Sequence, residues 1–484
     1  MAESDGPTDP DSPYAAMRSR KLRLLIPLIV AFAFLMEQLD STIVTTAIPA
    51  MAKSLGVGPL QLSAAVTSYV LSLAVFIPVS SWAADRFGTR RVFALALLIF
   101  TVASALCGLA QSLPALVAMR VLQGFGGAMS TPVGRLILLR AFPREQLIRA
   151  MTYMTIPAII GPTIGPILGG VLTTYVNWRW VFYVNVPIGA VGITLALRFV
   201  EDARVARPGR FDIRGFLLCG VGLGLMQFGI ENLRDLMLPR GIVIALASAG
   251  IVLLVSYFPY ARGRANAVLD LSLFSIRTFR ISTLVGGVSR TGINAVPFML
   301  PLLFQIGFGL SAVESGLLTF ISSTSALAVR PVASTLLRLF GFRRLLTWNG
   351  VVCAVVIASF ALVEARTPHW VDFLMVLVFG IVRSVQFMMT NTLTYADTPA
   401  AKLSKSTALG GIIQQLTVSF GVSIAAVLLG VIAGPGRRPD VADFHLAFLL
   451  VALITLLSAP GFLRLREDDA EHVSGHRRAE SPAV

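Results

Sequence analysis

Apolar runs of about 20 residues follow one another along almost the whole chain, and this succession restricts the possible folds more than any other feature. A helix of that length crosses the hydrocarbon core of a bilayer, where only helices and closed barrels satisfy all their backbone hydrogen bonds. Only 13% of the residues are charged, whereas soluble domains carry about 25%. These features predict an all-α polytopic membrane protein rather than a soluble enzyme with many buried helices.

The apolar runs predict fourteen transmembrane helices and a chain of five parts. The spans are expected near residues 24–51, 60–83, 92–111, 114–138, 150–175, 180–200, 213–231, 240–260, 281–306, 313–337, 344–364, 369–395, 406–432 and 444–463. A disordered cytoplasmic N-terminus (1–20) precedes an N-terminal six-helix bundle (21–200). Two inserted spans with cytoplasmic linkers (201–265) separate this bundle from a C-terminal six-helix bundle (266–463), and a loose cytoplasmic tail follows (464–484).

The net charge of +15 is distributed in small clusters of Lys and Arg between the apolar runs. In the predicted topology most of the 40 basic residues fall on one side of the membrane, and the positive-inside rule assigns that side to the cytoplasm. The distribution therefore places both termini in the cytoplasm and supports an even number of spans. It also argues against nucleic acid as a partner and for the lipid bilayer as the surroundings.

One loop motif occurs twice in the chain. SWAADRFGTRR at residues 81–91 is echoed by STLLRLFGFRR at residues 334–344, each time at the inner end of an even-numbered span. Such repeated halves are how many secondary transporters are built. In the first copy Gly88 permits a tight turn, and Asp85 is expected to pair with a helix N-terminus or with an Arg on the neighbouring bundle. The basic residues of this copy, which face the inner leaflet, are Arg86, Arg90 and Arg91.

The predicted fifth span contains the sequence GPTIGPILGG, residues 161–170. Gly161, Gly165 and Gly169 recur every fourth residue and form a smooth stripe on one face of a helix, with Gly170 beside it. Such a stripe lets two membrane helices approach backbone to backbone. Pro162 and Pro166 remove helix hydrogen bonds and are expected to add kinks. The combination suits a membrane helix that rocks against a neighbour.

Charged residues within the spans are expected to have functional uses, because each costs roughly 2.5–3.5 kcal/mol to insert at a helix centre. At 1.5 Å of rise per residue, Asp40 on the first span and Arg120 on the fourth both lie in the outer half of the membrane. We predict that they interact, directly or through water, and that a proton binding Asp40 weakens the pairing and shifts the balance between inward- and outward-open states. Glu37, one turn deeper, is the competing protonation site. The alternative for each is a structural ion pair or a snorkelling side chain.

Away from the ends of its predicted spans, the second half carries only positive charges, namely Arg290, Arg330 and Arg383. A buried cation needs a counter-ion, and a substrate anion would supply one. The polar residues assigned to the same candidate substrate cavity are Asn294, Gln386, Asn391, Gln414 and Gln415. The pattern therefore predicts an anionic or amphiphilic substrate with an acidic group, unless these arginines are structural or, for Arg330, snorkel to the inner surface.

Several motifs together resemble the major facilitator superfamily over residues 22–463. The loop at 81–91 resembles the loop that defines the superfamily, although the family usually has Gly at Ser81 and Leu at Ala83. In the fourth span, the run from Arg120 through Gln123 and Gly124 to Gly127 is similar to the motif of proton-coupled members. The glycine stripe of the fifth span resembles the motif of exporters.

Two further runs, at residues 39–44 and 177–189, resemble the fourteen-span drug:proton antiporter family, and runs around Arg290 and Asn391 look like its multidrug-resistance protein D subgroup. The resemblance implies a major facilitator fold of two six-helix bundles plus two extra spans in a bacterial inner membrane. It implies a functional monomer that exports small amphiphilic molecules by alternating access.

The resemblance also names protons as the coupling ion and the proton gradient as the energy source, without a cofactor or metal. A proton symporter or a facilitated uptake carrier for an organic anion is the alternative, and a periplasmic adaptor is left open. The sequence offers no channel-like filter repeat, no nucleophile–base constellation of an enzyme and no G-x-x-x-x-G-K-[ST] loop of an ATP-driven pump.

Overall fold

The structure is a computed structural model that describes residues 20–142, 144–202, 204, 211–232, 239–264, 267–399, 402–434 and 437–474. Within these residues all regular elements are helices. Residues 1–19, expected to be disordered, and the last ten residues of the expected tail lie outside the described residues.

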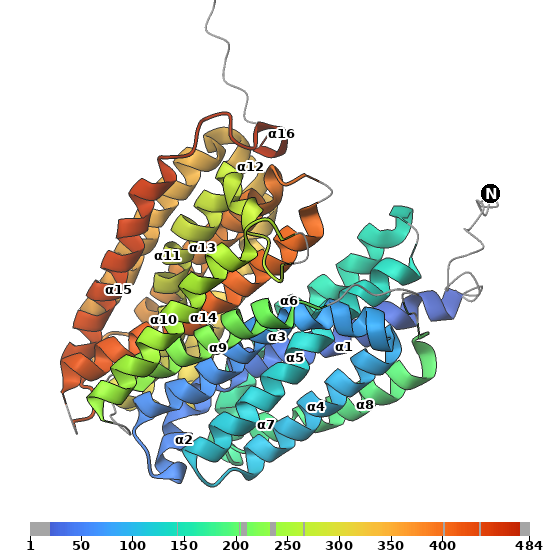
Figure 1. Cartoon of the computed structure of the whole chain (residues 1–484). Helices are drawn as coiled ribbons and strands as arrows, with labels where there is room; N and C mark the ends of the chain where they lie inside the picture. The colour runs from blue at the N-terminus through green and yellow to red at the C-terminus, as the bar shows by residue number, and fades with distance from the viewer. Residues whose placement is uncertain are drawn as a thin grey trace, which may run out of the picture.

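The first half of the chain folds into one bundle of long helices (Figure 1). Their bounds are α1 (Arg20–Ile43), η1 (Thr45–Ala47), α2 (Ile48–Leu55), η2 (Pro59–Leu62), α3 (Ser63–Phe87), α4 (Thr89–Leu109), α5 (Leu113–Ala141), α6 (Arg144–Tyr175), α7 (Trp180–Tyr183) and α8 (Asn185–Phe199). Helix α5 packs against α3 and α4, and α1 packs against α6 and α8.

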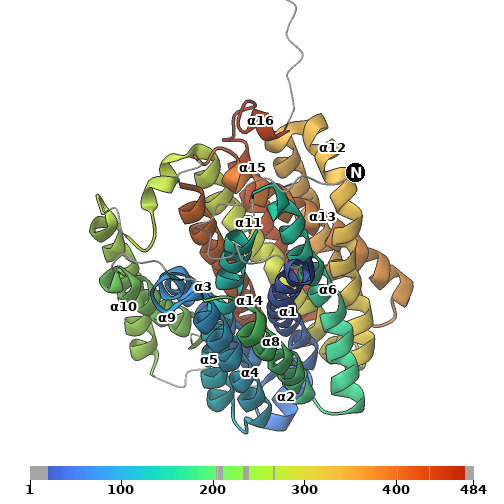
Figure 2. The same cartoon turned by 90° about the vertical axis from the view of Figure 1, so that its right-hand side faces the viewer.

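An inserted hairpin and a second bundle follow. Their bounds are α9 (Ile213–Asn232), α10 (Arg240–Ala261), η3 (Leu271–Ser275), α11 (Arg277–Leu302), η4 (Leu303–Gly307), α12 (Ala312–Ser359), η5 (Phe360–Leu362), α13 (His369–Ala396), α14 (Leu403–Ala433), α15 (Val441–Phe462) and α16 (Glu471–Ser474). In the second bundle α12 packs against α13 and α15, and α11 packs against α14 and α15. The hairpin of α9 and α10 lies on the side of the molecule where α3 meets α14 (Figure 2).

The helices coincide with the expected spans. Ten of them in the described part of the chain are long and apolar enough to cross a membrane. One of the ten, Ala312–Leu362, contains two expected spans, divided at Gly341, where φ is 66° and ψ is 167°. Three other expected spans correspond to α5, α6 and α11. The multi-pass helical architecture is thus confirmed, and the number of fourteen crossings stays a prediction.

The repeated loop motif occupies equivalent places in the two halves. Gly88 alone connects α3 to α4, with φ at 99°, and Gly341 turns α12 with a positive φ as well. Side chains rarely adopt such backbone angles, so glycine is required at both turns. We call the end of the molecule that carries Gly88, Gly341 and residues 463–474 the basic end. We call the other end, which carries α2, η2 and residues 437–440, the distal end.

Among the described residues, the hydrophobic core that the two halves share lies toward the distal end. One core joins residues of α1 and α2, such as Ile43 and Met51, to residues of α11 and α15, such as Met299 and Phe448. Toward the basic end each half has its own core, whose buried residues come from the first half in one case and from the second half in the other. Figure 1 shows the halves diverging toward the basic end, so the described conformation is closed at the distal end.

Two helix pairs make the seam between the halves, α6 with α12 and α3 with α14. Because α3 and the first part of α12 carry the two copies of the motif, the seams are related by the internal repeat. The repeat relates α3 to the first part of α12, so the pair of α3 and α14 corresponds to the pair of α12 and α6. An approximate two-fold arrangement of the halves gives two such corresponding seams.

The glycine stripe of α6 lies where the sequence predicted close helix approach. A Cβ on Gly161 would lie 2.6 Å from the Cβ of Gln38, and one on Gly169 would lie 2.4 Å from the carbonyl oxygen of Ile43. A Cβ on Gly170 would lie 2.5 Å from the carbonyl oxygen of Ala312 on the other half. The stripe therefore joins α6 to α1 on one side and to α12 on the other, backbone against backbone.

The expected loose tail begins instead with a packed segment. Leu465 and Ala470 are buried against the second bundle. Arg277 of α11 binds Asp469 with both guanidinium arms, at 3.0 and 2.6 Å. The charged residues that suggested a solvated tail are thus used in part as ion-pair partners of the second bundle.

Gly170→Ala is expected to lower the unfolding temperature of the detergent-solubilised protein, because the added methyl group overlaps the backbone of α12. Overpacking of this kind costs about 1–3 kcal/mol. The matched control is Gly224→Ala on α9, where a Cβ meets nothing within 4 Å. Equal unfolding temperatures for the two variants would contradict the close approach of α6 and α12.

Candidate functional site

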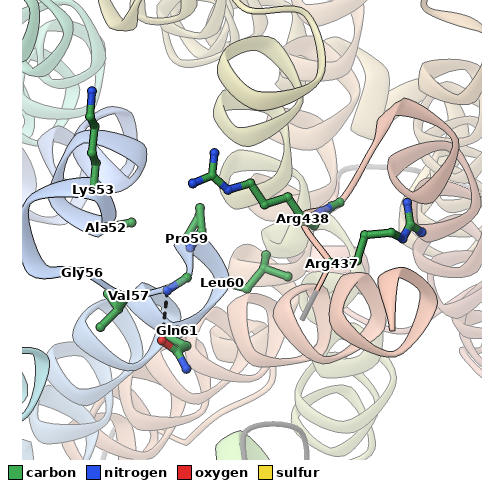
Figure 3. A pocket seen from close by; sticks show the side chains of 11 residues that line it. Ala52, Lys53, Gly56, Val57, Pro59, Leu60, Gln61, Arg437 and Arg438 are labelled. Atoms are coloured by element: carbon green, nitrogen blue, oxygen red, sulfur yellow. Dashed lines mark hydrogen bonds between the residues drawn. The ribbon is translucent and has the colours of Figure 1, made fainter. Parts of the chain in front are cut away.

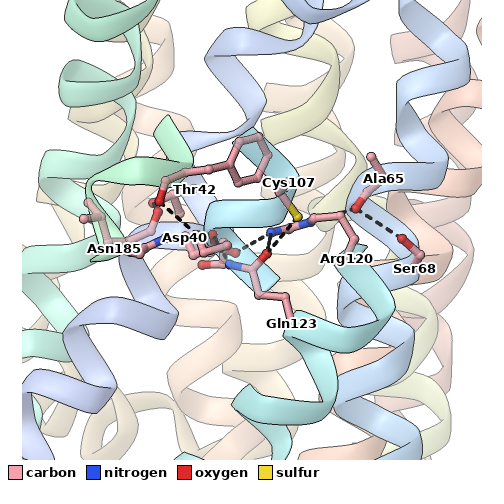
Figure 4. A network of polar contacts seen from close by, with 12 residues as sticks. Asp40, Thr42, Ala65, Ser68, Cys107, Arg120, Gln123 and Asn185 are labelled. Carbon is pink, nitrogen blue, oxygen red and sulfur yellow. Dashed lines mark hydrogen bonds and ion pairs between the residues drawn. The ribbon is translucent and has the colours of Figure 1, made fainter. Parts of the chain in front are cut away.

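Asp40 lies in the last turn of α1 and is fully buried (Figure 4). Its carboxylate Oδ2 is 2.6 Å from Nη1 of Arg120 on α5, which is the contact that the sequence analysis expected. Its Oδ1 accepts hydrogen bonds from Nε2 of Gln123 at 2.8 Å and from Nδ2 of Asn185 at 3.1 Å. Both carboxylate oxygens are therefore satisfied by residues of α5 and α8, and the site joins three helices of the first half.

Arg120 is held on the other side by neutral groups. Its Nε donates to the carbonyl oxygen of Ala65 at 3.0 Å, and its Nη1 also donates to Oε1 of Gln123 at 2.8 Å. Its guanidinium carbon lies 4.1 Å from the centre of the Tyr69 ring, within cation–π range. Because only 1% of the Arg120 side chain is exposed, the single carboxylate of Asp40 provides the negative charge at this site.

The neighbouring glycines of α5 explain how this helix comes so close to its neighbours. A Cβ on Gly124 would lie 2.5 Å from the carbonyl oxygen of Tyr69 on α3, and one on Gly126 would lie 2.7 Å from the backbone nitrogen of Phe100 on α4. The motif residues after Arg120 thus let α5 pack directly on two backbones. This packing brings Gln123 and Arg120 within reach of Asp40.

Asn185 is a site residue that the sequence analysis did not single out. It lies at the start of α8, is fully buried, and its Nδ2 also reaches Oγ of Ser104 at 3.1 Å. Its Oδ1 has no hydrogen-bond partner. The sequence signal that could have identified Asn185 was its place in the run at residues 177–189. That run resembles drug:proton antiporters, but the resemblance assigned no role to its individual residues.

Glu37 lies one turn before Asp40 and faces a different partner. It accepts a hydrogen bond from the hydroxyl of Thr131 on α5, and its side chain is half-buried. In the described part of the chain no Lys or Arg forms an ion pair with it. The two acids of α1 therefore differ in kind: Asp40 is enclosed in an ion pair, and Glu37 is more accessible and bound to a neutral group.

In the second half, two of the three expected arginines gather around one aromatic ring. The guanidinium carbons of Arg290 and Arg383 lie 5.3 and 5.6 Å from the centre of the Phe387 ring. Nη2 of Arg290 donates to Oδ1 of Asn391 at 2.7 Å, whereas its Nε has no partner among the residues that the structure describes. No acid of the described residues forms an ion pair with either arginine. The cluster is positive and has free donor capacity.

The other expected cavity residues have different surroundings. Gln386 is fully buried and accepts a hydrogen bond from Asn349 of α12 at 2.8 Å, so it links α12 to α13. Asn294 lies 3.4 Å from Oγ1 of Thr417 and links α11 to α14. Arg330 is exposed on α12, and it is not one of the two arginines whose guanidinium groups approach the Phe387 ring. Gln414 and Gln415 lie half-buried on α14.

The partner of Asp85 differs from the expectation of an Arg on the neighbouring bundle. Its Oδ1 is 2.6 Å from Nη2 of Arg140, which lies at the end of α5 in the same bundle. The buried core residues that the structure describes at the basic end belong to separate halves, so an acid there finds its partner within its own half. Gly88 packs on Asp202, whose carboxylate also lies 3.4 Å from Arg91.

A pocket of about 520 Å³ lies at the distal end between α2, η2 and the connection that precedes α15 (Figure 3). Lys53, Arg437 and Arg438 give its lining a positive character. Arg437 is already paired with Asp440 and Asp443, at 2.7 Å each. None of the expected site residues lines this pocket.

Asp40 and Arg120 are expected to show a large coupling energy in a double-mutant cycle. Asp40→Asn, Arg120→Gln and the double variant would be compared by reversible unfolding in detergent, and the coupling is expected at about 0.5–3 kcal/mol because the pair is buried. The exposed pair Arg437 and Asp440 is the control, with an expected coupling below about 1 kcal/mol. Additive effects at Asp40 and Arg120 would show that the pair contributes no interaction energy.

The comparisons with known proteins agree with this architecture. The model of the Major Facilitator Superfamily matches residues 30–422. Multidrug resistance protein MdtD of Pectobacterium carotovorum subsp. carotovorum is 38% identical over 437 residues, which cover 90% of this chain and 94% of the relative. The protein of the same name from Serratia proteamaculans is 38% identical over 446 residues, covering 91% of this chain and 93% of the relative.

Solved structures of transporters share the fold. A D-xylose-proton symporter superposes with a TM-score of 0.67 at 15% identity, over 92% of this chain and 99% of the symporter. The POT family transporter PepTSo superposes with a TM-score of 0.68 at 13% identity, over 91% and 97% of the two chains. At these identities the likeness shows the fold alone. The family model and the sequence relatives make the chain a multi-pass membrane transporter rather than an enzyme, and it belongs to the major facilitator superfamily.

Proposed function

We propose that this protein is a proton-coupled antiporter that exports small amphiphilic molecules that carry an acidic group. The observation that carries the proposal is the buried pair of Asp40 and Arg120, surrounded by Gln123 and Asn185. A charged pair enclosed within a membrane bundle is expensive, and functional use is the usual reason for keeping one. The names of the sequence relatives support multidrug export.

The chemistry of the pair suits proton coupling. A proton on Asp40 would remove the negative charge that holds Arg120, and a neutral carboxyl group can remain hydrogen-bonded to the amides of Gln123 and Asn185. Protonation would therefore weaken the link from α1 to α5 without leaving the carboxyl group unsatisfied. Glu37, which is more accessible and bonded to Thr131, is the second candidate for the proton.

The packing offers a physical route from Asp40 to the seam between the halves. The backbone beside Asp40 touches the glycine face of α6, where a Cβ on Gly161 would lie 3.0 Å from the nitrogen of Leu39. The same helix touches α12 of the other half at Gly170 and Gly316. A small movement of α1 is thereby passed to α6 and to the contact that closes the distal end.

The arginine cluster of the second half supports an acidic substrate. Nε of Arg290 has no hydrogen-bond partner among the described residues. The guanidinium groups of Arg290 and Arg383 both approach the flat ring of Phe387. Two cations beside an aromatic surface suit a molecule that combines a carboxylate or similar anion with an apolar body. The proposed carrier works as a monomer in a bacterial inner membrane, with the basic end and both termini in the cytoplasm.

Asp40→Asn is expected to reduce substrate transport driven by a pH gradient in liposomes by roughly tenfold or more, because removal of one partner leaves Arg120 buried without its counter-ion. Glu37→Gln is compared beside it, and Glu364→Gln, at an exposed acid of a distal connection, is the control. A complete loss of gradient dependence in Glu37→Gln alone would assign the proton to Glu37. Wild-type transport that ignores the gradient would contradict antiport.

Arg290→Met and Arg383→Met are expected to raise the KM for acidic amphiphiles by about tenfold each, since each removes a charge that would pair with the substrate. A panel of lipophilic cations, transported by the same preparations, is expected to show no such loss. Arg280→Met is the control, because Arg280 is an exposed arginine of the same helix as Arg290. Transport of cations in preference to acids would overturn the assignment of substrate class.

A further inference from the structure

The inserted hairpin contains a carboxyl group that the antiport mechanism does not use. Glu231 lies in the last turn of α9, near the distal end. Its Oε1 accepts a hydrogen bond from the hydroxyl of Thr67 on α3 and one from Oγ of Ser423 on α14, the latter at 3.2 Å. One carboxylate oxygen is therefore bound by both halves of the molecule at once.

A glutamine of the same helix completes the cluster. Nε2 of Gln227 donates to Oε1 of Glu231 at 3.1 Å and also binds Oγ of Ser423. Thr67, Ser423 and Gln227 are each at most 2% exposed, so the cluster is enclosed in the seam between α3 and α14. No basic side chain of the described residues forms an ion pair with Glu231. Its partners are neutral, and they come from three elements.

The position of this cluster matters because α3 and α14 form one of the two seams between the halves. At the other seam, α6 and α12 meet through glycines and share a direct hydrogen bond from the backbone nitrogen of Val313 to Oγ1 of Thr174 at 3.2 Å, without a third helix. At the seam of α3 and α14 the hairpin adds polar bonds to each side. When the distal end opens, Thr67 and Ser423 must move apart, and a single carboxyl group cannot keep both bonds.

We propose that Glu231 is a tether through which the inserted hairpin holds α3 and α14 together while the distal end is closed. The hairpin is then a working part of the transport cycle rather than a passive lipid-facing addition, and Glu231 is a positioning residue. The tether rests on the alternation between two states in the proposed function, but neither on proton coupling nor on the substrate class.

The test is a distance measurement between the halves at the distal end. Spin labels would be placed at Ser54→Cys on α2 and at Arg366→Cys on the connection between η5 and α13, both exposed. The three native cysteines are buried and would be replaced by alanine. Electron–electron double resonance in lipid nanodiscs, without substrate or a proton gradient, then reports the populations of closed and open distal ends independently of transport.

Glu231→Ala is expected to shift the ratio of open to closed distal ends by roughly tenfold toward open, because the hydrogen bonds to its buried carboxyl group are lost in the closed state only. Thr67→Val and Ser423→Ala remove one side of the tether each and are expected to give smaller shifts in the same direction. In the Glu231→Ala background neither is expected to add its full effect. Ser256→Ala, at an exposed hydroxyl of α10, is the control and is expected to give the wild-type distances.

Two further comparisons keep the test decisive. Gly170→Ala is expected to open the distal end by a different route, through overlap at the contact of α6 and α12. A shift in Gly170→Ala together with wild-type distances in Glu231→Ala, Thr67→Val and Ser423→Ala would overturn the tether while leaving the proposed function intact. Wild-type distances in all of these variants would overturn alternation itself and the tether with it. If Glu231→Ala fails to fold, Thr67→Val and Ser423→Ala decide the same question.

Discussion

The buried pair of Asp40 and Arg120 is the interaction around which the first half is organised. A guanidinium group with 1% of its side chain exposed requires an anion, and the anion requires its own donors. The chain meets both demands by bringing α1, α5 and α8 together at one point, and glycines of α5 make this approach possible. Among the described residues of the second half no acid pairs with the arginines at Phe387, and Nε of Arg290 remains a free donor there.

The closed distal end depends on a second constraint, which is the absence of side chains at the contact between α6 and its neighbours. Backbone contact of this kind relies mainly on close packing. Between α6 and α12 it is supplemented by a hydrogen bond from the backbone nitrogen of Val313 to Oγ1 of Thr174 at 3.2 Å, and such a contact can be broken and remade at low cost. The seam of α3 and α14 follows the opposite principle, because Thr67, Ser423 and Glu231 meet there through hydrogen bonds. The two seams close the same end of the molecule, one mainly by shape and the other by a cluster of polar side chains.

Much of the fold was predictable because the physics of the bilayer imposes a length and a polarity on each helix. The approach of Asp40 to Arg120 was also predictable, since helical rise alone gives both residues similar depths. The partner of Asp85 was not, because it depends on how the halves are arranged at the basic end, and in the described conformation the partner is Arg140 of the same half. The roles of Asn185 and Glu231 were not predictable for another reason. Asn185 begins a helix after an aromatic run, and Glu231 lies at the end of an apolar span. Neither sequence position indicates which residue lies opposite in the bundle.

The turns at Gly88 and Gly341 have a mechanical consequence. Helix α3 ends at Phe87 and α4 begins at Thr89, so one residue joins them, and α12 reverses at Gly341 with no loop at all. Such short connections leave no slack for one helix to slide along its partner. Each helical pair is therefore expected to rotate as a rigid body about a point near the distal contacts. A displacement of a fraction of an ångström there then becomes a larger displacement at the basic end.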